Sequence, residues 1–449
     1  MTGEQRTLKF ILDSAKDKEA PEDSVPYPIG IVRWVVCAFL FAAVALSYID
    51  RQVLSVLKPT LQAQYGWSET GYGDVVFWFQ AAYGVGYIAF GRIVDRIGAR
   101  LGYALAVGLW TIGHFAHALV TSTLGFALVR IPLALGESGA FPSALAAVAE
   151  WFPQKERALA IGLFNAGSNV GAILAPLIVP AITLAYGWRM AFIVTGLFTV
   201  VWLIGWLWFY RSPREHKSLT EEERLYIEAG HVEEKASVSW LSLLRLRETW
   251  AYIAGRFLID PIWWTFLFWL PDFFSKRYGI DLKSYGPPLV AIYLLADFGS
   301  IAGGWGSSRL LNLGFGLNAS RKIAMLACAV VVVPVAFAMH ASNIWLAVAL
   351  IGLATAGHQG FSANLFALPS DLFPRWAAGS VVGLGGAAGA VGGMLMAKYA
   401  GWVLQTVGSF TPIFVVASGA YLLALLVVHL LSPHYRTALV RPPVAASTR

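Results

Sequence analysis

Six charged side chains stand inside long apolar stretches of this sequence, where a charge needs a partner or a wet cavity. They are Asp50, Arg51, Arg130, Glu137, Arg256 and Asp260. A charge at the centre of a membrane helix costs about 2.5–3.5 kcal/mol on insertion scales, so six isolated charges would cost more than a typical domain's stability. In hydrocarbon, such residues mark pathways for ions, protons or charged substrates.

Sequence spacing limits which of these charges can pair on their own helix. Arg256 and Asp260 are four residues apart and can pair directly. Asp50 and Arg51 are adjacent, so on a helix they point about 100° apart. Each of these two therefore needs a partner on another helix.

The composition explains why these charges must lie in a membrane. The 449 residues are 57% hydrophobic and 13% charged, whereas soluble domains are about 45–50% apolar and about 25% charged. This excludes a soluble enzyme, a disordered chain and a disulfide scaffold. The two cysteines, Cys37 and Cys328, fall in apolar segments and are interpreted as packing residues. The net charge of +7 indicates basic cytoplasmic loops rather than nucleic-acid binding.

Twelve apolar stretches are long enough to cross a bilayer, which takes about 20 residues of helix. The first six are predicted at 34–57, 72–94, 100–121, 124–149, 157–182 and 190–210. The last six are predicted at 250–275, 286–310, 321–341, 343–370, 376–402 and 410–431. The polar stretch between the two sets contains Ser218 and Thr220 before an acidic turn, which predicts a short surface helix.

The distribution of Lys and Arg orients these spans. With the N-terminus in the cytoplasm, 24 of the 33 fall on the cytoplasmic side and 5 on the outer side. Because cytoplasmic loops carry the excess of positive charge, both termini are predicted to be cytoplasmic. The outer residues are Lys58, Arg189, Lys276, Arg277 and Lys283.

An internal repeat divides the chain in two. A shift of 221 residues aligns EWFP at 150–153 with DLFP at 371–374, and GESG at 136–139 with GHQG at 357–360. Parallel repeats of this kind place a transporter's substrate near the midplane, between the halves. We therefore predict an all-α membrane protein with twelve transmembrane helices in two six-helix halves. Its predicted parts are an N-terminal tail (1–33), a first half (34–210), a linker (211–249), a second half (250–431) and a C-terminal tail (432–449).

A short motif lies in the predicted cytoplasmic loop between the second and third spans. Residues 91–100 read GRIVDRIGAR. The Asp95 carboxylate among these arginines can form ion pairs, here called the clasp, that break when the two halves move relative to each other. This segment resembles the signature loop of the major facilitator superfamily. The resemblance implies that superfamily's fold and a gating role for Gly91, Asp95, Arg96 and Arg100.

Finer resemblance extends over nearly the whole chain. Residues 48–51 and 130–142 are similar to the anion:cation symporter family. Residues 164–176, 260–273 and 357–366 resemble its hexuronate-transporting branch. The resemblance implies proton-coupled import of glucuronate or galacturonate by alternating access, across a bacterial inner membrane.

Roles for the membrane charges follow from this resemblance and from their chemistry. Asp50 and Glu137 are expected to carry protons, because burial favours the neutral form of a carboxyl group; the alternative is a permanently ionised strut. Arg51 is expected to bind the substrate carboxylate with its planar fork, or else to serve as a counter-ion for Glu137. Arg130, seven residues before Glu137 on the same face, is expected to organise that acid.

The remaining pair, Arg256 and Asp260, is expected to be structural. A uronate also has several hydroxyls, so its site needs amides, hydroxyls and an aromatic face. Candidates on the predicted spans are Gln80, Tyr83, Asn165, Ser168, Asn169, Trp264, His358, Gln359 and Asn364. His358 can titrate near neutral pH, although a satisfied structural histidine explains it equally well. His114 and His117 share a helix face without a third ligand, so no metal site is predicted.

There are two alternatives to hexuronate import, one with the same fold and one from a different functional class. Import of another organic anion, such as an aldonate, glucarate or tartrate, uses the same fold. A membrane-embedded enzyme or sensor would need a catalytic motif or a signalling tail, and the sequence contains neither pattern. We therefore expect a transporter that needs no cofactor and uses the proton gradient. Its partners are a small organic anion, protons and the lipid bilayer but no nucleic acid, and it is expected to act as a monomer.

Overall fold

The computed structural model describes residues 30–229 and 240–435. The N-terminal half consists of α2 (Val32–Tyr65), α3 (Glu69–Ala116), η1 (His117–Leu119), α4 (Thr123–Ser138), α5 (Ala140–Trp151), α6 (Gln154–Tyr186) and α7 (Trp188–Phe209). The C-terminal half consists of α10 (Arg247–Tyr278), η2 (Leu282–Ser284), α11 (Gly286–Asn312), α12 (Leu317–Val332), η3 (Val333–His340), α13 (Ile344–Leu365), α14 (Leu368–Leu372), α15 (Arg375–Thr406) and α16 (Thr411–Leu431). Between the halves lie α8 (Glu221–Ala229) and α9 (Trp240–Leu243). Most of both predicted tails lies outside the described residues.

The helices follow the predicted spans closely. Ten helices or joined helix pairs of the described chain are long and apolar enough to cross a membrane. The 48-residue α3 is not among these ten, but at 1.5 Å per residue it is about 70 Å long, enough for two crossings. Its backbone breaks at Gly98, where φ is 78°, a value that favours glycine. The second and third predicted spans are therefore the two segments of α3.

The internal repeat reappears as repeated local structure. Pro153 and Pro374 precede α6 and α15, with φ/ψ of −63°/155° and −57°/149°. In both copies the preceding phenylalanine closes the helix before it: the amide of Phe152 donates to Val148, and that of Phe373 to Pro369. Each Phe-Pro step therefore ends one helix and starts the next long one.

Small residues bring helix backbones close together, as their enrichment predicts. A Cβ atom on Gly167 would lie 2.3 Å from the carbonyl oxygen of Phe41, so α6 packs directly on α2. Between the halves, a Cβ on Gly401 of α15 would lie 2.9 Å from the carbonyl oxygen of Glu69 on α3. The same crossing places Gly73 against Gly401, with 3.2 Å from a Cβ on either to the other's Cα.

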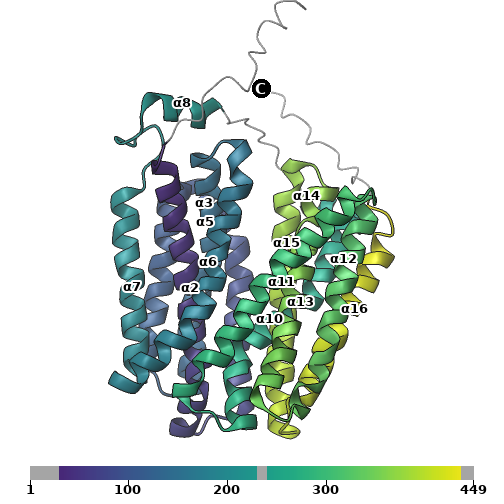
Figure 1. Cartoon of the computed structure of the whole chain (residues 1–449). Helices are drawn as coiled ribbons and strands as arrows, with labels where there is room; N and C mark the ends of the chain where they lie inside the picture. The colour runs from purple at the N-terminus through teal and green to yellow at the C-terminus, as the bar shows by residue number, and fades with distance from the viewer. Residues whose placement is uncertain (1–29, 230–239, 436–449) are drawn as a thin grey trace, which may run out of the picture.

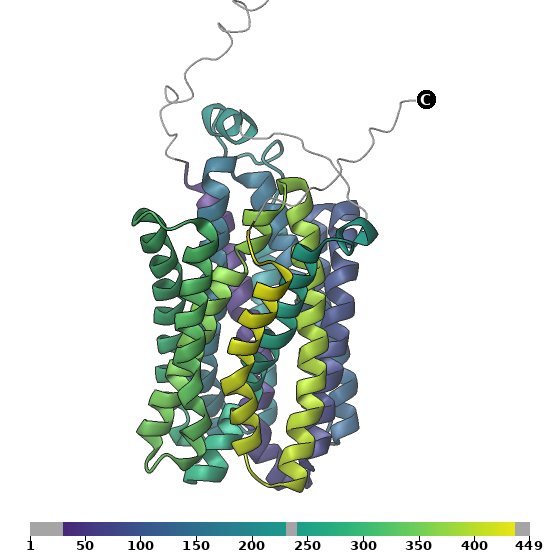
Figure 2. The ribbon, with the colours of Figure 1, turned by 90° about the vertical axis from the view of Figure 1, so that its right-hand side faces the viewer.

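The two ends of the bundle differ. We call the end that carries α8 the α8 end, and the opposite one the distal end (Figures 1 and 2). The described chain both starts and stops at the α8 end, and the ribbons of the two halves converge toward the distal end in Figure 1. The surface helix α8 was predicted, and Thr220 caps it by accepting from the amide of Glu223 at 3.2 Å. Arg33 anchors it to α2, with Nη1 3.0 Å from the Glu223 carboxylate.

One prediction about the outer loops was wrong. Lys58 does not lie in a loop: α2 continues past it to Tyr65, and its side chain is fully buried. Lys276 and Arg277 likewise belong to the last turn of α10, and Arg189 to the first turn of α7. The predicted spans were too short because these helices continue into polar sequence beyond their apolar stretches.

Candidate functional site

A buried ion pair lies at the centre of the bundle, where the two halves meet. Arg51 on α2 binds one oxygen of Glu137 on α4, with Nη2 at 2.7 Å and Nε at 2.9 Å. Both side chains are almost completely buried. Arg51 is therefore held by two charge-assisted hydrogen bonds, and the second oxygen of Glu137 has no partner among the described residues.

Aromatic rings enclose the Arg51 guanidinium. Its Cζ atom lies 4.7 Å from the ring centre of Tyr48, 5.2 Å from that of Tyr83 and 4.8 Å from that of Trp264. Trp264 comes from α10 in the other half, so this aromatic compartment spans the interface. Rings at these distances stabilise a cation and offer flat faces to a sugar ring.

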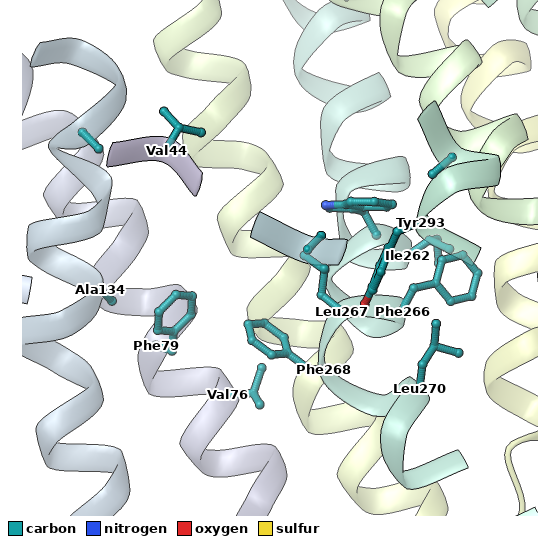
Figure 3. Close-up of a cluster of buried hydrophobic side chains, with 14 of the residues drawn as sticks. Val44, Val76, Phe79, Ala134, Ile262, Phe266, Leu267, Phe268, Leu270 and Tyr293 are labelled. Atoms are coloured by element: carbon teal, nitrogen blue, oxygen red, sulfur yellow. The ribbon is translucent and has the colours of Figure 1, made fainter. Parts of the chain in front are cut away.

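Phe79 and Phe268 lie beside this compartment, one from each half (Figure 3). Their ring centres are 5.7 Å apart in an edge-to-face arrangement. Arg130 lies over both rings and donates to the carbonyl oxygen of Arg51 at 3.3 Å. Its Nε and Nη1 atoms have no partner in the described chain, and the ion pair of Glu137 is formed with Arg51 instead. Arg130 thus belongs to the cluster without bonding the acid that the sequence assigned to it.

Asp50 faces away from this compartment, as its position next to Arg51 predicts. Its side chain is fully buried inside the N-terminal half. One carboxylate oxygen accepts from the Thr199 hydroxyl on α7 at 3.0 Å, and the other lies 3.3 Å from Nε2 of His114 on α3. The two acids expected to carry protons therefore occupy separate compartments on either side of α2.

In the C-terminal half, Arg256 and Asp260 form the predicted i,i+4 pair on α10. Nη2 of Arg256 lies 2.6 Å and Nε 2.7 Å from the same carboxylate oxygen. The guanidinium also donates to the Tyr252 hydroxyl at 3.2 Å and lies 4.3 Å from the ring centre of Phe366. This pair is satisfied within its own half.

Two predicted polar residues point into the interface between the halves. Gln80 is fully buried, and neither its amide nitrogen nor its oxygen has a partner among the described side chains and backbone. A Cβ on Gly393 of α15 would lie 3.0 Å from the Gln80 amide carbon, so this amide faces the other half. Asn169 on α6 similarly lies beside Asp297 on α11. The Gln80 amide is therefore available to bond a hydroxyl group, and the Asn169 amide can exchange Asp297 for one.

Other predicted residues lie elsewhere. His358 stacks on Trp263 at 5.0 Å, and its nitrogens meet the hydroxyls of Tyr421 at 2.7 Å and Ser362 at 3.3 Å. The Asn364 amide donates to two backbone carbonyls at 3.0 Å and joins α13 to α11. Both side chains are thus used within the C-terminal half, and the structure does not bring them to the aromatic compartment.

Three further candidates lie on α6 and α13. Asn165 is exposed, and Ser168 donates to the Asn165 carbonyl oxygen at 2.7 Å. Gln359 is half-buried. In the described residues, no group of three or more His, Cys, Asp or Glu is arranged to hold a metal.

The predicted gating motif lies at the α8 end. Asp95 and Arg96 are exposed, and neither forms an ion pair with another described residue. Arg100 donates to the carbonyl oxygen of Leu207 at 2.6 Å, and a Cβ on Gly91 would meet nothing within 4 Å. The clasp expected around Asp95 is therefore not formed in this conformation.

A charge cluster that the sequence analysis missed joins the halves at the distal end. Lys58 on α2 pairs with Asp272 on α10 and with Glu69 on α3. Lys276 on α10 pairs with the same two acids. The sequence feature that could have predicted this cluster is Asp272. It is a charged residue inside the predicted span 250–275 and was not counted with the other six. We call these residues the distal charge cluster: Lys58, Glu69, Asp272 and Lys276.

Comparison with known proteins gives consistent matches. The sequence profile of the Major Facilitator Superfamily matches residues 40–395. The hexuronate transporter of Escherichia coli strain K12 is 35% identical over 404 residues, which cover 88% of this chain and 93% of that protein. The galacturonate transporter of Dickeya chrysanthemi is 35% identical over 285 residues, covering 62% of this chain and 82% of that protein.

A solved structure gives the same fold. It is a bacterial homologue of the human lysosomal transporter Spinster, crystallised in an inward-facing and occupied conformation. It matches with a TM-score of 0.72 and 16% sequence identity, covering 92% of this chain and 100% of the other. At this identity the likeness concerns the fold alone.

Proposed function

Because this chain belongs to the Major Facilitator Superfamily and is a multi-pass membrane transporter, we propose that it imports hexuronates together with protons by alternating access. The observation that carries this proposal is the Arg51–Glu137 pair inside an aromatic compartment shared by both halves. The similarity to hexuronate and galacturonate transporters supports the substrate class.

Protonation of two acids, Asp50 and Glu137, supplies the coupling, and Glu137 acts directly on the substrate site. While Glu137 is charged, it occupies the fork of Arg51 through Nε and Nη2. A proton on Glu137 removes the negative charge, so the fork is free to bind a substrate carboxylate in the same bidentate geometry. Loss of that proton on the other side restores the internal pair and expels the substrate. The substrate carboxylate thus replaces the Glu137 carboxylate on Arg51 only while Glu137 carries its proton, so proton and uronate move together.

The rest of the compartment suits a sugar ring. Tyr83 and Trp264 provide aromatic faces beside the Arg51 guanidinium. The free amide of Gln80 can donate to one ring hydroxyl and accept from another. Asn169 adds a second amide from α6.

Alternating access requires one end to close while the other opens. The distal charge cluster and the Gly73–Gly401 crossing hold the distal end together, while Asp95 at the α8 end is free of ion pairs with other described residues. We assign the α8 end to the cytoplasm, because most Lys and Arg flank it. Import across a bacterial inner membrane then releases the substrate at the α8 end, and the single chain is sufficient for the whole cycle.

Uptake into liposomes containing the purified protein tests this function. Labelled glucuronate and galacturonate are expected to enter, and unlabelled uronates are expected to compete while glucose does not. Galactonate, glucarate and tartrate in the same competition assay test the alternative of another organic anion. Arg51→Ala should abolish uptake, and Arg224→Ala, at a partly exposed position on α8, serves as the matched control. Stronger competition by an aldonate or aldarate than by uronates would assign the transporter to that anion instead.

A further inference from the structure

The environment of Asp50 raises the question of how a proton reaches it. Its side chain is fully buried, and its polar neighbours come from α3 and α7 of its own half, with His114 at 3.3 Å and Thr199 at 3.0 Å. The aromatic compartment surrounds Arg51, about 100° away from Asp50 around α2. A proton path to Asp50 therefore differs from the path of the substrate, and the nearest titratable group on that path is His114.

The hydrogen bonds of His114 assign its tautomer. The Thr195 hydroxyl donates to the carbonyl oxygen of Ala191 at 2.8 Å, so it accepts from Nε2 of His114 at 2.7 Å. Nε2 of His114 therefore carries the ring proton and lies 3.3 Å from the Asp50 carboxylate. Nδ1 is left as a bare acceptor, buried and without a partner among the described residues.

His117 lies one helical turn closer to the distal end. Its Nδ1 is 2.7 Å from the carbonyl oxygen of Gly113, which can only accept, so Nδ1 carries the proton. Nε2 is then the second bare and buried nitrogen without a partner in the described chain. The two ring centres are 6.2 Å apart. Two acceptors cannot bond to each other, but the two O–H groups of one water molecule can donate to both.

We infer that His117 and His114 relay protons between the distal end and Asp50, through the N-terminal half and separately from the substrate. A proton arriving at Nδ1 of His114 gives an imidazolium ion. The Nε2 proton then moves to the Thr195 hydroxyl oxygen as the Thr195 O–H proton moves to Asp50, which leaves a neutral ring, a neutral hydroxyl and a neutral carboxyl. The step is reversible, and net import of the proton requires Asp50 to release it after the distal end has closed. This inference rests on the proposed proton coupling, since without it Asp50 has no proton to exchange.

The charges around His114 and His117 favour passing a proton on over keeping it on either ring. Arg130 on α4 acts on both rings and opposes a lasting positive charge on either. Asp50 on α2 is the acid nearest to His114, and Glu137 on α4 opposes a negative charge on Asp50. From α7, Phe192 stacks on His117 at 5.0 Å without offering a charge. Transfer of a proton from an imidazolium to the Asp50 carboxylate leaves both groups neutral, which burial favours.

The alternative is that a neutral His114 merely packs 3.3 Å from Asp50 and holds it in place. His117 separates the two explanations, because among the described residues it contacts Gly113, His114 and aromatic rings but not Asp50. A strut needs only His114. A relay needs both histidines.

The experiment compares His117→Gln and His114→Gln with the exposed control His340→Gln in liposomes. Glutamine keeps hydrogen-bonding groups but cannot pass a proton on. We expect pH-gradient-driven uptake and the accompanying proton flux to fall by about tenfold or more in both variants. Exchange of internal for external substrate, which needs no net proton transfer, should stay within about threefold of the wild type.

Four results test the relay and the proton coupling on which it rests. Normal pH-driven uptake by His117→Gln overturns the relay, and so does an equal loss of uptake and exchange, since that indicates structural damage. A wild type that moves substrate but never against its gradient under an imposed pH difference instead refutes the proposed proton coupling itself. A slower pH-driven uptake in D₂O that is absent from exchange supports proton transfer as the affected step.

Discussion

Lys58 and Asp272 form an ion pair between the two halves of the molecule, with both side chains buried. Glu69 accepts a second bond from Lys58 at 2.7 Å, and Lys276 lies 3.0 Å from Asp272. Two cations and two anions thus neutralise one another, with Lys58 and Asp272 shielded from water and Lys276 partly exposed. Because α2 and α3 belong to one half and α10 to the other, the distal end cannot open without separating this cluster.

The first prediction removes one partner of this pair. Lys58→Met should favour opening of the distal end, because breaking a buried ion pair costs about 3–5 kcal/mol, reduced here by the remaining Lys276. Spin labels at the exposed positions Gln64 and Thr406 measure the distance between the halves at this end. We expect a population with a longer distance, and the exchange Lys58→Asp with Asp272→Lys should restore the short one. An unchanged distance in Lys58→Met would mean that the pair does not hold the halves together.

The second prediction concerns the helix crossing beside this cluster. Gly401→Val should prevent closure of the distal end, since even a Cβ there would lie 2.9 Å from the backbone oxygen of Glu69. The distance between spin labels at Gln64 and Thr406 should therefore be longer in this variant. Uptake should fall because the closed state of the distal end is lost. Gly419→Val is the control, because its Cβ would meet nothing within 4 Å. Equal behaviour of the two variants would argue against a role for close packing.

The sequence predicts the architecture well because a membrane helix is specified by its own composition. The helix α10, for example, was predicted at 250–275 and extends over Arg247–Tyr278. What failed was the location of Lys58 at a helix end. Charged residues continue a helix beyond its apolar stretch when a partner from another segment neutralises them, and sequence spacing carries no information about that partner.

The third prediction concerns coupling at Arg51. Glu137→Gln resembles the protonated acid, so it should bind glucuronate with an affinity that no longer changes between about pH 6 and pH 8. The wild type should bind more tightly at the lower pH, because protonated Glu137 leaves Arg51 free. Titration calorimetry at both pH values measures this, with the exposed Glu221→Gln as the control. A pH-dependent affinity in Glu137→Gln equal to that of the wild type would contradict competition for Arg51.

The fourth prediction concerns the loop at the α8 end. Asp95 forms no ion pair with another described residue here, so its contacts are expected to form when the α8 end closes. Asp95→Asn should therefore slow the exchange between conformations while substrate affinity stays within about threefold of the wild type. Single-turnover exchange and equilibrium binding separate the two quantities. Lost binding with normal exchange would place Asp95 at the substrate site.

Within the candidate site, sequence reasoning identified the participants better than their partners. It placed Asp50 and Arg51 in different directions and paired Arg256 with Asp260, both of which follow from helical geometry alone. It linked Glu137 to Arg130 on the same helix and gave the pairing of Glu137 with Arg51 only as the alternative role of that arginine, and this alternative is the ion pair that forms. His114 was considered only as a metal ligand, and it was set aside because a third ligand is missing. Contacts between helices depend on helix rotation and crossing, which one sequence does not specify.

Proton-driven accumulation of glucuronate tests the central claim most directly. Liposomes containing the wild type, with a more acidic outer solution, should concentrate labelled glucuronate above its external level and take up protons with it. Asp50→Asn should lose this accumulation and retain exchange of substrate for substrate, because a neutral amide cannot release a proton. Accumulation by Asp50→Asn equal to that of the wild type, or glucuronate entry into wild-type liposomes that the pH gradient does not drive, would contradict the account.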